Sequence, residues 1–127
     1  MMSRSLDEIL MACNRLLGDL AEATFINPEV IRTTIERQCG EWSEREREDV
    51  LRIAEHTASH CANELFFAKE GAEECPHWQK SIATTAIGHL WTQAMMGACL
   101  GRRKAPPREN LAASFEALDE EYGPEPD

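Results

Sequence analysis

Apolar residues recur every three to four positions along most of this chain, which is the period of an amphipathic helix. The clearest case begins after Ser5, where apolar residues occupy positions 6, 9, 10, 13, 16, 17 and 20. Ser5 and Glu8 form the Ser-x-x-Glu pattern of a capping box at the start of this stretch. The sequence therefore predicts a first helix from Leu6 to near Phe25, with one apolar stripe that faces a core.

Two more helices are predicted before Gly71. The shorter one covers 28–39, because it begins at an Asn-Pro pair, which is typical of a helix start, and is followed by a glycine. The longer one covers 44–70, since it begins at a second Ser-x-x-Glu capping box and contains no helix breaker. Its first turns are charged and should face solvent, whereas its later apolar face is broad enough to contact two neighbouring helices.

Residues 81–100 contain no Asp, Glu, Lys or Arg, although 28% of the chain is charged. A helix of this length spans roughly 30 Å, which is also the thickness of the hydrocarbon core of a bilayer. The stretch holds His89, Gln93 and three threonines, and such groups disfavour a membrane span because they need polar partners in lipid. We therefore interpret it as a buried helix, beginning at Pro76 and closed by Gly101, around which the other helices pack.

A last helix is predicted over 108–122, after an extended connector that contains two prolines. Its final turn is acidic, which is unfavourable at the C-terminal end of a helix dipole, so the helix should depend on docking to its own core or to a partner. Its apolar stripe provides four candidate interaction residues: Leu111, Phe115, Leu118 and Tyr122. Residues 123–127 are interpreted as a flexible acidic tail.

Together these elements predict an all-α fold, a compact bundle of four to five helices around the buried central helix at about 81–100. One helical domain over 1–122 is expected, because a chain of 127 residues has the length of a single domain. A hydrophobic content of 43% is sufficient for one core.

The charge balance narrows the class of partner. A formal net charge of −10 and a pI near 4.8 argue against direct nucleic-acid binding, which usually requires a basic face, and are compatible with a basic protein partner. The five cysteines are odd in number and form no Cys-x-x-Cys pair, and charged residues interrupt the N-terminal region where a signal peptide would be apolar. We therefore expect a reduced cytoplasmic protein without disulfide bonds.

One group of residues suggests metal chemistry. His56, His60 and Glu64 follow one another at intervals of four, so a helix projects them from one side. A His-x-x-x-His pair can present two imidazoles to zinc or another divalent metal, with Glu64 as a third ligand or a base, and His89 would complete the site if the two helices face each other. The His-Glu-x-x-His form is absent, because Thr57 stands at the glutamate position. Without metal, His60 and Glu64 would hydrogen-bond each other.

Two functional hypotheses follow, since no catalytic motif is evident. The first is a small acidic cytoplasmic interaction or regulatory protein, an inhibitor or adaptor for a basic, nucleic-acid-binding protein, with no cofactor and no membrane association. It is expected to self-associate, because a short chain with three tryptophans and five methionines does not cover all of its apolar faces. The alternative is a metal-binding helical-bundle enzyme or sensor that uses His56, His60 and Glu64.

Overall fold

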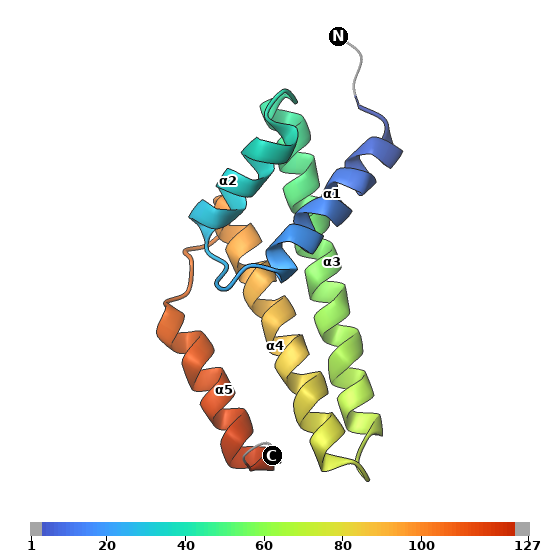
Figure 1. Cartoon of the computed structure of the whole chain (residues 1–127), viewed down its shortest axis with the longest axis vertical. Helices are drawn as coiled ribbons and strands as arrows, with labels where there is room; N and C mark the ends of the chain where they lie inside the picture. Colours follow the sequence, from blue (N-terminus) through green and yellow to red (C-terminus); the bar gives the residue numbers. More distant parts are fainter. Residues whose placement is uncertain (1–3, 124–127) are drawn as a thin grey trace.

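Five α-helices make up the computed structural model, which describes residues 4–123 (Figure 1). They are α1 (Leu6–Ala21), α2 (Pro28–Cys39), α3 (Glu44–Gly71), α4 (Pro76–Cys99) and α5 (Arg108–Tyr122). No β-strand occurs among the described residues, so the predicted all-α fold is confirmed. The tail predicted over 123–127 lies outside the described residues except for Gly123.

The long helices α3 and α4 form an antiparallel hairpin, which is the frame of the bundle (Figure 1). The helices α1 and α2 pack on the half of this hairpin that is remote from its turn, whereas α5 lies alongside α4 nearer the turn. Because α4 contacts α2, α3 and α5, it is the central helix that the sequence predicts. Within residues 4–123, none of the helices is both long and apolar enough to cross a membrane.

The apolar core is concentrated in the half of the hairpin that α1 and α2 cover. Fully buried side chains there include Leu16 of α1, Ile31 of α2, Val50 of α3 and Met95 of α4. Nearer the turn, the buried residues of α3 and α4 are mainly alanines: Ala58, Ala62, Ala83 and Ala86. Their small side chains let the two helices approach closely but bury little apolar area. This half of the hairpin therefore gains less stability from its own core.

The first helix is shorter than the sequence predicts, since it ends at Ala21 rather than near Phe25. The chain leaves the helix because its next apolar residues pack against α4 instead of continuing the stripe. The ring of Phe25 lies 5.9 Å from that of Trp91, and the indole Nε1–H of Trp91 donates to the carbonyl of Ile26 at 2.8 Å. These contacts with α4 determine where α1 stops.

The end of α4 confirms the role predicted for Gly101. This glycine has φ of +73°, a left-handed conformation that other residues rarely adopt. Its N–H donates to Ala98 at 3.1 Å, and the N–H of Arg102 donates to Gly97 at 3.0 Å. The pair of bonds is a Schellman motif, which satisfies carbonyl groups at the helix end. At the start of α4, Cys75 occupies the N-cap position and Pro76 the first helical position, but the side chain of Cys75 makes no capping hydrogen bond.

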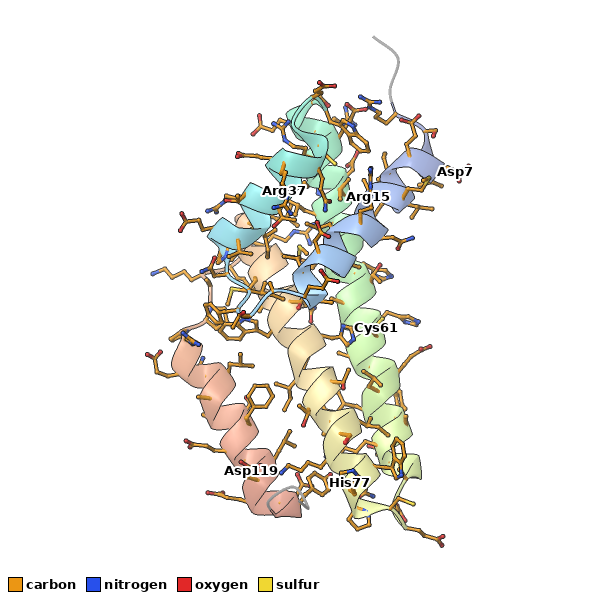
Figure 2. All side chains as sticks on the ribbon, in the orientation of Figure 1. Asp7, Arg15, Arg37, Cys61, His77 and Asp119 are labelled. Carbon is orange, nitrogen blue, oxygen red and sulfur yellow. The ribbon has the colours of Figure 1, made fainter. Side chains whose placement is uncertain are left out.

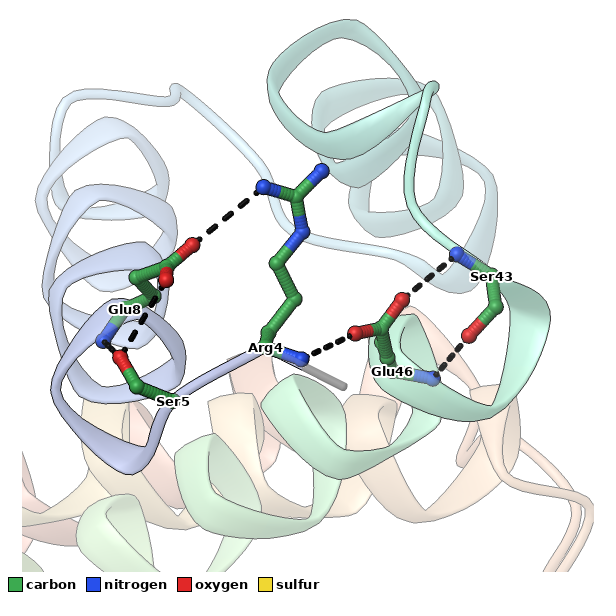
Figure 3. A network of polar contacts seen from close by, with 5 residues as sticks. All are labelled: Arg4, Ser5, Glu8, Ser43 and Glu46. Atoms are coloured by element: carbon green, nitrogen blue, oxygen red, sulfur yellow. Dashed lines mark hydrogen bonds and ion pairs between the residues drawn. The ribbon is translucent and has the colours of Figure 1, made fainter. Parts of the chain in front are cut away.

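Glu46 joins the starts of α1 and α3 (Figure 3). It completes the predicted capping box of α3, because its Oε1 accepts the N–H of Ser43 at 3.0 Å while its own N–H donates to the Ser43 hydroxyl at 3.2 Å. Its Oε2 also accepts the backbone N–H of Arg4 at 2.8 Å, just before α1. The backbone hydrogen bonds from Ser43 and Arg4 lower the pKa of Glu46, since they favour the ionised carboxylate.

This network predicts a pH-dependent effect of Glu46→Gln. Because the folded pKa of Glu46 lies below the ordinary value of about 4.3, the stability from its carboxylate is complete above that value and is lost as pH falls through the folded pKa. In urea unfolding, the variant should be less stable than wild type at neutral pH, and the gap should close as pH falls below about 4.3. Glu44→Gln, in the same first turn, is the control and should show a much smaller gap. A Glu46→Gln gap that stays constant with pH would contradict this role.

Candidate functional site

The four residues of the predicted metal site are only partly brought together. His60 Nε2 lies 3.2 Å from Glu64 Oε1 on α3, and both side chains are exposed. His56 is exposed on the same helix, whereas His89 is half-buried on α4 and lines a cavity. Within residues 4–123, no group of three or more His, Cys, Asp or Glu side chains is placed to hold one metal ion. The arrangement supplies a pair of adjacent ligands, His60 and Glu64.

Of the four candidate interaction residues, Leu111, Phe115 and Leu118 lie on the side of α5 that packs against α4 of the same chain. The ring of Tyr122 lies against Lys69 of α3. Leu118 is buried, and the other three are half-buried: Leu111, Phe115 and Tyr122. The last helix therefore docks in cis, which the sequence left open.

Two lysines of the hairpin hold the acidic end of α5. Lys80 is only 7% exposed, and its Nζ lies 2.7 Å from Asp119 Oδ1 and donates to the Gly123 carbonyl at 2.8 Å. Figure 2 shows Asp119 on the side of α5 that faces α4. Lys69 lies over the Tyr122 ring, and its pKa is raised by a hydrogen bond with Tyr122 and by the charge of Glu121. These cations compensate the unfavourable acidic last turn.

A cavity of about 370 Å³ opens on the hairpin beneath the C-terminal end of α1. Its volume lies in the range of small-molecule and side-chain pockets. Most of its lining is apolar, with a few polar groups from α3 and α4. The residues around it include Leu17, Leu20, Ile26, Thr57, Cys61, Thr85, Gly88, His89 and Thr92. Figure 2 places Cys61 between α3 and α4, directly below the end of α1.

The cavity has hydrogen-bond acceptors in two threonine hydroxyls, beside the imidazole of His89, which always carries at least one N–H donor. The hydroxyl of Thr85 donates to the Ser81 carbonyl at 3.1 Å, and that of Thr92 donates to the Gly88 carbonyl at 2.9 Å. Each hydroxyl has then used its hydrogen, but its oxygen retains lone pairs. No Asp, Glu, Lys or Arg of the described chain lines the cavity. It therefore suits an uncharged apolar group, which can donate a hydrogen bond to either hydroxyl oxygen.

An uncovered strip of the hairpin continues from the cavity towards the turn (Figure 1). On α4, Trp78 precedes Thr85 by seven residues and His89 by eleven, about two and three helical turns, so the three share one face. Trp78 is 64% exposed. We call this strip the open face and define it by Cys61, Leu65, Trp78, Ile82, Thr85 and His89. The bundle covers its hairpin unevenly, since α1 stops before this region and α5 lies on another side of α4.

The turn of the hairpin carries a second feature, which we call the acidic end. It consists of Glu70, Glu73 and Glu74, all exposed, together with Phe67, which is 73% exposed. Phe67 follows Cys61 by six residues, which places it about 120° around α3 from the cavity. Phe67 and the cavity therefore lie on different sides of α3.

Three of the five cysteines offer little nucleophilic chemistry. All five are free thiols. Burial raises the pKa of Cys13, Cys39 and Cys99, which favours the unreactive thiol form at neutral pH. Cys13 is buried in the core, whereas Cys61 and Cys99 are only half-buried.

No family model, curated protein or solved structure matches this chain. Its function is therefore interpreted from its own residues, above all from the cavity, the open face and the acidic end.

Proposed function

We propose that this chain is a non-enzymatic, acidic interaction protein of the cytoplasm, an inhibitor or adaptor that binds a basic partner of the kind that itself binds nucleic acids. The acidic end carries the proposal. Exposed carboxylates attract a basic segment from a distance, and an exposed aromatic ring gives that segment an apolar contact. The net charge of −10 acts in the same direction.

The cations near the acidic end are engaged elsewhere. Lys80 pairs with Asp119, and Lys69 lies 3.7 Å from Glu121, so both lysines are directed at α5. The carboxylates of Glu70, Glu73 and Glu74 make no ion pair with another described residue. The local potential is consequently negative, and a cationic partner meets no competing lysine there.

The proposal predicts that binding of a basic peptide depends on these three glutamates. A synthetic amphipathic helix of lysine and leucine is the probe, and fluorescence anisotropy measures its affinity. Changing Glu70, Glu73 and Glu74 together to glutamine should weaken binding about tenfold at low ionic strength. The difference should shrink at about 0.15 M salt, where the screening length falls to about 8 Å. Phe67→Ala should weaken binding at both ionic strengths.

A matched control separates a local site from overall charge. Glu29, Glu36 and Glu41 are equally exposed, but they lie on and after α2, and changing them to glutamine removes the same charge. This control should reduce affinity much less than the change at the acidic end. If both triple variants weaken binding equally, net charge alone explains the attraction and the acidic end is not a docking site.

The alternative of a metal enzyme or sensor has one supporting observation, the contact between His60 and Glu64. A metal held there needs further ligands from His56, His89 or water. Stoichiometric zinc in the purified protein, lost in His60→Ala, would favour this alternative over the interaction protein.

A further inference from the structure

We infer that the open face binds a second copy of this chain, with Trp78 of each protomer seated in the cavity of the other. The inference rests on the cavity and on Trp78 rather than on the carboxylates of the acidic end, so it does not depend on the basic-partner proposal. It gives a specific surface to the self-association that the sequence predicts.

The charge distribution favours a second copy over other partners on this face. Two chains that each carry −10 repel each other wherever their acidic surfaces meet. None of the residues that define the open face is Asp, Glu, Lys or Arg, because its α4 side belongs largely to the uncharged stretch 81–100. Copies can therefore approach here with the least repulsion, and the face offers no charge with which to recognise a charged partner.

The spacing of the two complementary features fits a two-fold axis. Trp78 and His89 are eleven residues apart on one face of α4, a distance of about 16 Å along the helix. If two α4 helices pack antiparallel about an axis between residues 83 and 84, Trp78 of each chain lies opposite His89 of the other. A two-fold interface is self-complementary by construction, so one exposed ring and one cavity per chain make two identical junctions.

The chemistry of the cavity matches an indole. An indole ring is large and apolar, and its Nε1–H is only a donor. The cavity offers acceptors in the hydroxyl oxygens of Thr85 and Thr92, whose hydrogens are already used. Of the three tryptophans, Trp91 donates to Ile26 and Trp42 lies half-buried beneath Arg4. Trp78 is exposed, and its Nε1–H has no partner among the described residues.

Sedimentation equilibrium of the full chain tests this inference. Wild type should dimerise with a dissociation constant in about the micromolar range, since the face is small. Trp78→Ala should weaken dimerisation at least tenfold, and Trp78→Phe should have a smaller effect because it keeps the ring and loses the donor. Met11→Ala removes another apolar side chain, 64% exposed on α1, and should leave the dissociation constant unchanged.

Blocking the cavity supplies an independent variant. Gly88 lines the cavity, and a Cβ added there meets no atom within 4 Å, so Gly88→Leu places the start of a bulky side chain in open space at the cavity. It should weaken dimerisation as Trp78→Ala does. A mixture of the two variants should form heterodimers more strongly than either forms homodimers, because only the heterodimer has one intact ring and one intact cavity in contact.

Three outcomes would overturn the inference: a wild-type monomer at all accessible concentrations, a Trp78→Ala variant that dimerises like wild type, or a mixture that forms no preferred heterodimer. Native mass spectra of wild type that show a monomer carrying a small molecule, lost in Gly88→Leu, would also overturn it and assign the cavity to a free ligand. Circular dichroism of each variant separates lost association from failure to fold.

Discussion

Replacing Leu16 with alanine is expected to lower the free energy of unfolding by about 3–5 kcal/mol, the largest single effect that this structure predicts. Leu16 is 0% exposed and lies in the core where α1 meets the hairpin. Its truncation removes buried methyl groups and leaves a void that a close-packed interior fills only in part. For a chain of this size, the thermal midpoint should fall by about 10–20 °C.

The same helix provides the control for Leu16→Ala. Leu6 is 66% exposed, so Leu6→Ala deletes the same atoms from a site that contacts solvent. Its effect should stay within about 0.5 kcal/mol. Urea unfolding followed by circular dichroism measures both variants. Both residues belong to the apolar stripe that the sequence predicts, so equal effects of the two substitutions would contradict the burial of Leu16 and the exposure of Leu6.

Replacing Lys80 with methionine is expected to release the C-terminal part of α5. Methionine keeps most of the apolar stem of lysine but removes the ammonium group that binds Asp119 and the Gly123 carbonyl. Hydrogen bonds that involve a charged group contribute about 1.5–3 kcal/mol each. Because the Asp119 side chain is 62% exposed and is readily rehydrated, we expect a total loss of about 2 kcal/mol.

The loss should be local to α5, because α4 is the only helix within residues 4–123 with which α5 makes extensive contacts. Amide hydrogen exchange should show α5 opening about 30-fold more often in Lys80→Met, with little change in α1 and α2. Lys69→Met is the matched control and should have a smaller effect, since the Lys69 ion pair is longer, at 3.7 Å against 2.7 Å, and its side chain is more exposed. Unchanged exchange protection of the α5 amides in Lys80→Met would contradict the role of Lys80 in holding α5 against α4.

The release of α5 would also affect the two proposed binding surfaces differently. The α5 side of α4 and the open face lie on different sides of the same helix, so Lys80→Met should leave the dimer contact of Trp78 intact. Lys69, freed from Glu121, would however lie close to the acidic end, where it would compete with a basic partner for the glutamates.

The sequence by itself determined the helices of this protein. Periodicity, capping residues and helix breakers act between residues that are close in the chain, so the starts of α1, α2, α3, α4 and α5 match the predicted ones closely. The capping box at Ser43 and the left-handed Gly101 are of this kind. Helical spacing also predicted the contact between His60 and Glu64, which lie one turn apart.

Only the tertiary structure decided how those helices use their remaining surfaces. The end of α1 at Ala21 depends on Trp91, which is 70 residues further along the chain. Lys80 sits at the start of an apolar helix, and no local pattern shows that Asp119 and Gly123 will surround it. The cavity exists because α1 crosses the hairpin and stops there. Helix formation depends on residues that are close in the chain, whereas contacts between distant segments decide which helix faces stay uncovered. Binding is proposed on those uncovered faces.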